Sequence, residues 1–374
     1  QSFDYKNTRK VRWLKKNISR SVLSYEFHNS LKTAMSIWSL NDYKSAVSDL
    51  LRGIYQKDDD RIEEEDENME LVFNTDIKTE YERNRIVFGA PGTGKSYGLK
   101  DDCEKLMEDT AGTYERVTFH PDYTYSQFVG TYKPVMNEDG NTIRYDFIPG
   151  PFMRVYVDAL KSGRTDNPQP HLLLIEEINR AKVAAVFGDI FQLLDRDDDG
   201  VSEYAIQASE DIRRYLAKEL NLGENGDNYK KICIPNNMFI WATMNSADQG
   251  VYPMDTAFKR RWNFEYLGIN ENEEEIKDIG KIMLPGSDEP IEWNILRKAI
   301  NDKMSSSDFK INEDKLMGPF FLSKKAIASN ENGMIIDTDR FISAFKSKVI
   351  MYLYEDAVKQ GKHRFFEGCD SSKY

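Results

Sequence analysis

Short apolar runs alternate with helical patterns between about residue 80 and residue 268. Five of these runs are rich in Ile, Leu, Val and Phe and have the length of buried strands. The predicted strands are residues 85–88, 116–119, 172–175, 238–243 and 263–267. Strands that alternate with helices are joined by crossovers and therefore pair in parallel. The pattern predicts an α/β domain built on a five-stranded parallel sheet.

Helical stripes lie between the predicted strands. The first stripe ends at Gly163 and consists of Phe152, Val155, Tyr156, Ala159 and Leu160. The second consists of Val183, Val186, Phe187, Ile190, Phe191 and Leu194. Residues three and four apart share one face of a helix, so each stripe predicts an amphipathic helix. The pair Asp139-Gly140, between β-rich stretches at 133–136 and 142–147, is typical of a tight hairpin turn.

The two ends of the chain have a different character. Residues 41–55 have the spacing of an amphipathic helix, and nine carboxylates follow between Asp58 and Glu70, opposed only by Arg61. Such an acidic run is typical of a solvated linker. After about residue 268 the pattern is mostly helical. We therefore expect four regions: a helical N-terminal segment (1–57), an acidic linker and lead-in (58–79), the α/β core (80–268) and an α-helical lid (269–374).

Composition and charge exclude several classes of protein. With 374 residues, 40% hydrophobic and 30% charged, the chain has the composition of a globular protein of two or three packed units. A net charge of −12 argues against a generally basic nucleic-acid coat. No apolar run reaches the ~18 residues of a membrane span, and we expect no signal peptide, because no apolar stretch follows the basic residues near Gln1. The three cysteines form no C-x-x-C pair. We expect a cytoplasmic protein without a membrane partner.

The first predicted strand leads directly into a phosphate-binding motif. The sequence from Gly89 to Ser96, GAPGTGKS, fits G-x-x-x-x-G-K-[ST] and can open a helix. Its glycines allow backbone N–H groups to converge on phosphate oxygens, and Lys95 would reach the β- and γ-phosphates. The predicted nucleotide-binding residues are Gly89, Ala90, Pro91, Gly92, Thr93, Gly94, Lys95, Ser96 and Tyr97.

Two glutamates follow the third predicted strand. In a P-loop nucleotide hydrolase the acid at this strand end positions Mg²⁺ together with the P-loop hydroxyl, and the next acid activates water. Here Glu176 and Ser96 are the predicted metal residues and Glu177 is the predicted catalytic base. Glu176 stands where Asp is usual, so a longer side chain would face the metal. The alternative is a strand that runs into two solvated acids.

Polar residues after the fourth predicted strand complete the candidate site. Asn245 ends that strand and can orient the attacking water, and Asp248 follows it. Arg260 and Arg261 precede the last strand, and arginine can stabilise charge on a transferring phosphoryl group, often from a neighbouring subunit. A basic turn on the surface is the alternative for each arginine.

Together these stretches resemble the McrB family, AAA+ GTPases of methylation-dependent (type IV) restriction systems. The resemblance rests on GAPGTGKS, TFHPDYTYSQFVGTYKP, LLLIEEINRAKVAAVFGDIFQLLDRD and WATMNSADQGVYPMDTAFKRRW, and more weakly on LMGPFF at 316–321. It implies an AAA+ core with a lid, a ring that is usually hexameric, hydrolysis of GTP with Mg²⁺, and a McrC-like endonuclease partner. In the family motif M-N-x-x-D-R, Gln249 replaces the arginine here, which puts in doubt whatever that arginine contributes. By the same resemblance Arg260 and Arg261 fall where the trans-acting arginines lie.

The basic segment around Trp13 is similar to stretches that follow modified-base readers in McrB-type proteins. That similarity implies contact with DNA through a domain upstream of this chain. A solvated basic face is the alternative reading of the same residues.

The residues leave several questions open. No N-K-x-D-type guanine reader is present, so the substrate is either GTP, as the family implies, or ATP, as in most AAA+ proteins. The competing function is that of a MoxR-like AAA+ chaperone that remodels protein clients without a nuclease. A third is a nucleotide-gated DNA-binding scaffold, supported only by Glu176 and Gln249. The acidic loop at 195–200 lacks the bidentate Glu of a calcium-binding EF-hand, so we expect no calcium site there.

Overall fold

The computed structural model describes residues 71–368 except 138–139, 141, 221–228, 247–249 and 285. The predicted helix at 41–55, the acidic run at 58–70 and the basic segment around Trp13 lie outside the described residues. The lead-in from Leu71 is packed against the core, because the Thr75 backbone N–H and hydroxyl donate to Asn236 Oδ1 at 2.9 and 2.7 Å.

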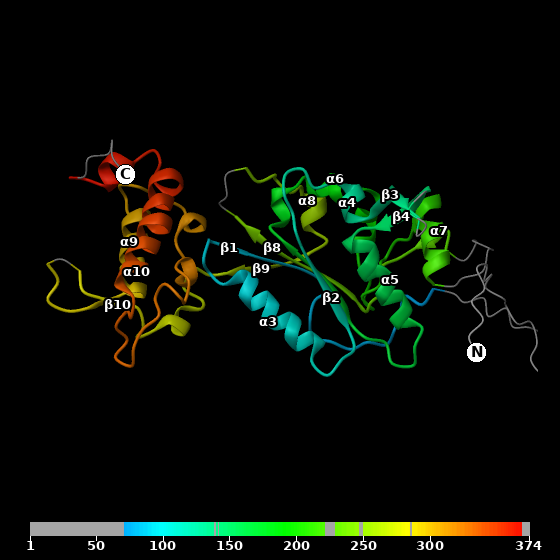
Figure 1. Ribbon diagram of the computed structural model, residues 1–374, viewed down its shortest axis with the longest axis horizontal. Coiled ribbons are helices and arrows are strands. Elements are labelled where there is room, and N and C mark those ends of the chain that lie inside the picture. Colours follow the sequence, from blue (N-terminus) through cyan, green and yellow to red (C-terminus); the bar gives the residue numbers. More distant parts are fainter. Residues whose placement is uncertain are drawn as a thin grey trace, which may run out of the picture. The chain divides into compact units, whose positions relative to one another are not determined.

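A five-stranded parallel sheet forms the centre of the core (Figure 1). Its strands, in sheet order, are β2 (Thr113–Thr118), β5 (His171–Glu176), β8 (Met238–Asn245), β1 (Asn84–Gly89) and β9 (Asn263–Leu267). All four neighbouring pairs run parallel, so the predicted fold class is confirmed. The carboxyl ends of β5, β8 and β1 consequently lie along one edge of the sheet.

Helices cover both faces of the sheet. On one face, Leu99 and Cys103 of α3 (Lys95–Met107) pack with the apolar side chains that β1, β5 and β8 direct to that side. On the other face, Phe152 and Tyr156 of α5 (Pro151–Gly163) pack in the larger apolar cluster. Residues of α6 (Val183–Phe187) and α8 (Thr256–Lys259) belong to that second cluster as well. The periodic stripe that ends at Gly163 is thus a helix, as predicted.

The second stripe, from Val183 to Leu194, does not form one continuous helix. It divides into α6 and a 3-10 segment, η4 (Gly188–Leu194). The break falls at Gly188, whose φ is +54°, and a Cβ there would lie 2.7 Å from the Tyr125 ring. The expectation of a single helix was wrong because the backbone leaves the helical region at Gly188, where the close Tyr125 ring also leaves no room for a Cβ.

The predicted hairpin is present as β3 (Gly130–Met136) and β4 (Ile143–Pro149), which pair antiparallel; Asp139 of the predicted turn lies outside the described residues. Apolar residues alternate along both strands, so one face of the hairpin is apolar. At its base Phe147 packs against Tyr215 of α7 (Glu210–Glu219), with ring centroids 5.0 Å apart. The remaining short elements of the core are α4 (Tyr125–Phe128), η3 (Ile178–Arg180), β6 (Ile206–Gln207) and β7 (Lys231–Ile232).

The C-terminal region has an apolar cluster of its own, built from residues between Ile276 and Phe365. Its helical elements are η5 (Glu273–Ile276), α9 (Trp293–Ser305), η6 (Glu313–Lys315), η7 (Pro319–Phe321), α10 (Thr338–Ala344), the π-helical η8 (Phe345–Ile350) and η9 (Leu353–Ala357), and α11 (Lys362–Phe365). A two-stranded ribbon of β10 (Lys281–Ile282) and β11 (Ile291–Glu292) joins them, which the sequence pattern did not predict. Among the described residues no helix is long and apolar enough to cross a membrane.

Candidate functional site

The glycine-rich loop lies between the carboxyl end of β1 and the first turn of α3. Gly92 and Gly94 have φ values of +77° and +96°, a region that other residues avoid. The backbone therefore turns tightly enough for α3 to begin at Lys95, directly after the loop. A helix N-terminus beside a glycine-rich loop is a favourable place for phosphate oxygens.

Lys95 folds back over this loop. Its Nζ donates to Ala90 O at 2.7 Å and to Gly89 O at 3.1 Å, and the residue is only 8% exposed. An ammonium group held against backbone carbonyls can exchange them for phosphate oxygens, since it has three donors and no acceptor. The structure thus places the Lys95 charge within the loop.

Glu176 is the last residue of β5 and is largely buried. Its Oε2 accepts hydrogen bonds from the hydroxyls of Ser96 at 2.8 Å and Thr243 at 2.5 Å. Its Oε1 forms a 2.6 Å ion pair with Nη2 of Arg116. The structure brings Ser96 and Glu176 together, although they are 80 residues apart in the sequence.

This donor set fits Mg²⁺. A carboxylate can only accept a hydrogen bond, so the Ser96 hydroxyl is the donor to Glu176, and the lone pairs of its oxygen remain available to a cation. Mg²⁺ prefers oxygen ligands, binds through one or two protein groups and retains several waters. Ser96 and Glu176 are therefore the two residues that could hold the ion beside a nucleotide.

Glu177, the next residue, has a left-handed backbone, with φ of +56°. Its N–H donates to Thr243 Oγ1 at 3.2 Å, and its Oε1 accepts a 2.6 Å hydrogen bond from Nδ2 of Asn245. Arg180 lies 3.4 Å from its other oxygen. The two predicted catalytic residues, Glu177 and Asn245, are thus in direct contact.

Three residues that the sequence reasoning did not single out hold this arrangement together. Asn179 is 4% exposed and donates from Nδ2 to Asn245 O at 2.8 Å, which ties the residues after β5 to the end of β8. Thr243 and Arg116 contact Glu176. The sequence contains only a weak signal for two of these residues. Thr243 is a polar residue within a buried apolar strand, and Arg116 lies on the edge strand of the sheet.

The C-terminal region contacts the back of the glycine-rich loop. The N–H groups of Gly318 and Phe320 each donate at 2.8 Å, to Pro91 O and Gly92 O, and Asn272 Nδ2 donates to Thr93 O at 2.9 Å. A Cβ on Gly318 would lie 2.4 Å from Gly92 backbone atoms, so the approach requires glycine.

Tyr97, predicted to bind nucleotide, is 64% exposed.

The two predicted arginines lie near the amino ends of the strands, opposite the carboxyl ends that carry the glycine-rich loop and Glu176. Both line a cavity of about 830 Å³ together with Asn84 and Asn263, which begin β1 and β9, and Asn236, which lies two residues before β8. A six-residue strand spans ~20 Å, so neither guanidinium belongs to the phosphate site of its own chain. Asp248, the remaining predicted residue, lies outside the described residues, as does Gln249.

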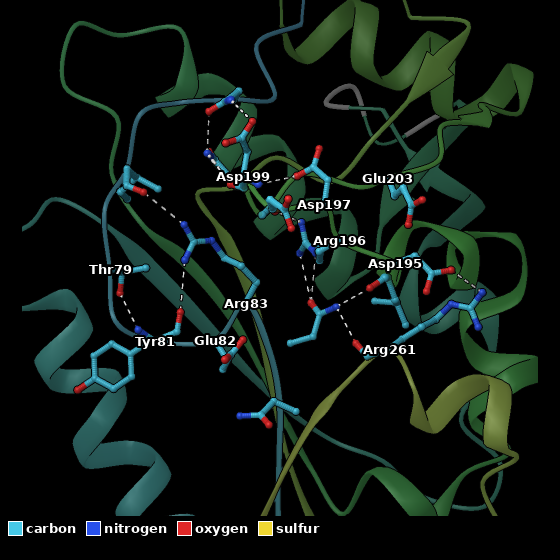
Figure 2. A pocket seen from close by; sticks show the side chains of 18 of the residues that line it. Thr79, Tyr81, Glu82, Arg83, Asp195, Arg196, Asp197, Asp199, Glu203 and Arg261 are labelled. Carbon is cyan, nitrogen blue, oxygen red and sulfur yellow. Dashed lines mark hydrogen bonds and ion pairs between the residues drawn. The ribbon is translucent and has the colours of Figure 1, made fainter.

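The structure distinguishes Arg260 from Arg261. Arg260 is exposed at the end of α8. The Arg261 side chain is 8% exposed, forms a 2.7 Å ion pair with Asp195 (Figure 2) and lies 4.0 Å over the Phe191 ring. Arg260 can therefore reach a neighbouring molecule, whereas Arg261 is bound within its own chain.

The acidic loop at 195–200 is a structural turn. Asp197 Oδ1 accepts from the N–H groups of Asp199 and Val201 at 3.0 and 2.9 Å. The Arg196 side chain is half-buried, and its desolvation lowers its pKa to about 9. It donates to Asn84 and to backbone carbonyls around it. No group of three or more His, Cys, Asp or Glu that could hold a metal occurs in the part of the chain that the structure describes.

Comparison with known proteins agrees with this geometry. Residues 84–262 match the family described as AAA domain (dynein-related subfamily). The chain is 44% identical over 299 residues to the type II restriction enzyme BsuMI component YdiS of Bacillus subtilis (strain 168), covering 74% of this chain and 80% of that protein. It is 25% identical over 183 residues to the type IV methyl-directed restriction enzyme EcoKMcrB subunit of Escherichia coli (strain K12). This second match covers 49% of this chain and 34% of that protein.

A solved structure of a Cytophaga hutchinsonii protein covers 63% of this chain and 51% of that one. The two sequences are 16% identical, and the TM-score is 0.29.

Proposed function

The chain belongs to the McrB-like AAA+ proteins, and on that premise we propose that it is the nucleotide-driven ring motor of a cytoplasmic DNA restriction system. One observation carries the proposal: the phosphate site lies at one edge of the sheet and the exposed Arg260 at the other. A complete catalytic site then requires two chains, head to tail, and repeated head-to-tail contacts close into a ring. We propose the hexamer that is usual in the family.

In this proposal each residue at the phosphate site has one task. Lys95 binds phosphate oxygens, and Ser96 with Glu176 holds Mg²⁺, which when bound neutralises charge on the phosphates. Glu177 removes a proton from the attacking water, and Asn245 orients that water. Arg260 of the adjacent chain stabilises the transferring phosphoryl group.

We propose GTP as the preferred substrate, with ATP as the alternative, and a McrC-like endonuclease subunit as the partner that the motor drives. The names of the two relatives, both restriction-enzyme components, support the partner. DNA would be read by a domain upstream of this chain, joined to the motor through the segment at 1–57, which is predicted to be helical, and the predicted linker and lead-in at 58–79.

Phosphate release from GTP and ATP, measured over protein concentrations that span assembly, tests the motor. We expect GTP to be preferred and the rate per subunit to rise with concentration. Arg260→Ala should abolish that rise and lower the rate of phosphate release per subunit by a factor on the order of 10³. Lys259→Ala, at the neighbouring exposed position, is the matched control and should behave as wild type.

Mixing two inactive variants tests the shared site directly. In a ring of Arg260→Ala and Glu177→Gln chains, some interfaces combine an intact Glu177 with an intact Arg260. Activity should reappear on mixing; if it does not, while both variants assemble, the shared site is wrong. If the enzyme prefers ATP while the rise of rate with concentration and the shared site are both found, the MoxR-like remodelling function is favoured instead.

A further inference from the structure

Arg116 forms an ion pair with Glu176, the carboxylate proposed to bind Mg²⁺. The nucleotide-binding motifs of the sequence do not include this arginine. It lies on β2, the edge strand, and its Nη2 is 2.6 Å from Glu176 Oε1. The Arg116 side chain is 48% exposed, whereas that of Glu176 is 9% exposed. A buried acid is thus paired with a cation at the rim of the site.

The strand register explains why only a long side chain can make this contact. Thr118 is the direct neighbour of Glu176, and Arg116 is paired with Leu174. Residues two apart in a strand share a face, so Arg116, Thr118 and Glu176 lie on the same side of the sheet. Arg116 must reach diagonally along that face to Glu176, a span within reach of arginine.

The contact determines how Glu176 presents its two oxygens. Arg116 holds Oε1, and the hydroxyls of Ser96 and Thr243 both donate to Oε2. The guanidinium also offsets the negative charge of the carboxylate. Both effects bear on a cation that binds beside Ser96.

We propose that Arg116 is a positioning residue that acts through Glu176: it fixes the longer acid in place and lowers the affinity of the site for Mg²⁺. The proposal rests on the proposed function, because it assumes that this site binds Mg·nucleotide. Without Arg116, Glu176 would present a full negative charge to the ion, and its Oε1 would no longer be held in place. Mg²⁺ would then bind more tightly, and catalysis would be slower.

The first test is the Mg²⁺ dependence of nucleotide binding, which requires no turnover. Binding of a fluorescent GTP or ATP analogue is titrated with Mg²⁺ in wild type, Arg116→Met and Arg116→Lys. We expect the half-saturating Mg²⁺ concentration to fall about ten-fold in Arg116→Met, since a cation within several Å of the ion is removed. Arg116→Lys keeps the charge and should stay within about three-fold of wild type.

Arg154→Met is the matched control. Arg154 has a similar exposure, 46%, and an ion pair with Glu115, but no contact with Glu176. Its removal should leave the Mg²⁺ dependence unchanged. An equal shift in this variant would mean that general surface charge, and not Arg116, sets the affinity.

A double-mutant cycle tests whether Arg116 acts through Glu176. In a Glu176→Gln background, Arg116→Met should no longer tighten Mg²⁺ binding. Steady-state kinetics at saturating Mg²⁺ should show a lower kcat with little change in KM for Arg116→Met alone. If Arg116 had only a structural role, Arg116→Met would lower the melting temperature in both backgrounds. Its effect on Mg²⁺ binding would then not depend on Glu176. If Arg116→Met does not fold, Arg116→Gln enters the same cycle with the same expected result.

The outcomes separate this inference from the proposed function. If wild type binds neither nucleotide analogue at any Mg²⁺ concentration, the proposed function fails. If wild type binds nucleotide but Arg116→Met leaves the Mg²⁺ dependence unchanged, only the role of Arg116 is overturned.

Discussion

The side-chain amide of Asn245 donates a 2.6 Å hydrogen bond to Glu177 Oε1, joining the end of β8 to the residue that follows β5. Because a carboxylate only accepts, Asn245 must use its NH₂ group for this contact, which leaves its carbonyl oxygen to accept from a water molecule. Asn179 fixes the same strand end through Asn245 O. The geometry thus places next to each other the two groups that we propose to accept a proton and to orient water.

Glu177→Gln should block hydrolysis while nucleotide still binds. Gln keeps an oxygen that can accept from Asn245 but cannot take a proton, so we expect kcat to fall by roughly 10²–10⁴. Nucleotide affinity should stay within a few-fold, measured by binding at saturating Mg²⁺. Glu265→Gln, on β9 and paired with Arg85, is the control. Turnover within three-fold of wild type would exclude Glu177 as the base.

Asn245→Ala should lower kcat about ten-fold with little change in KM, because it loosens Glu177 without touching the phosphate loop. Residues that act as a unit are not additive. Adding Asn245→Ala to Glu177→Gln should therefore cost little more, as single-turnover rates would show. Full additivity would mean that Asn245 acts independently of Glu177.

Much of this site could be predicted because its signals are local. The glycine-rich loop is contiguous from Gly89 to Ser96, and apolar runs mark the strands. Parallel strands place their carboxyl ends at one edge, so the meeting of Ser96 with Glu176 followed from topology. These contacts need no knowledge of side-chain packing.

The rest depends on tertiary contacts that no local pattern encodes. Arg116 reaches Glu176 only because β2 lies beside β5 in a particular register. Arg260 and Arg261 are equivalent in sequence, and only the packing of Phe191 and Asp195 around the second tells them apart.

Arg261→Ala should therefore destabilise the fold. Removal of its side chain leaves Asp195 without a cation in a largely buried contact and exposes the Phe191 ring. We expect the free energy of unfolding to fall by about 2–4 kcal/mol. Chemical denaturation of the nucleotide-free protein measures it. Arg260→Ala, at the exposed neighbour, should change it by less than about 0.5 kcal/mol. Equal losses in the two variants would contradict the distinction.

His171 should make stability fall at mildly acidic pH. Its ring is largely buried, Nδ1 lies 2.9 Å from Thr113 Oγ1, and burial lowers its pKa from the usual 6.5. The unfolded chain therefore takes up the proton first as pH falls. The stabilising contribution of neutral His171 is complete above about pH 6.5, declines below it and levels off below the folded-state pKa.

Denaturation midpoints at several pH values between 5 and 7.5 would measure this contribution of His171. His171→Gln removes the titrating group and should flatten the curve in that window. His120→Gln, at an exposed position, serves as the control. A wild-type curve that keeps its slope in His171→Gln would assign the pH dependence to other groups.

Gly318→Ala should weaken nucleotide binding by displacing the C-terminal region from the phosphate loop. A Cβ at this position would lie 2.4 Å from the backbone of Gly92, so the Gly318–Pro91 hydrogen bond cannot be kept. Because the loop loses this support, we expect KM for nucleotide to rise about ten-fold, with a smaller change in kcat. Gly98→Ala is the matched control: it lies in α3 with no atom within 4 Å of the added Cβ, and should stabilise the protein by roughly 0.5–1 kcal/mol. If Gly318→Ala binds nucleotide as wild type does, the contact between the C-terminal region and the loop is dispensable for binding.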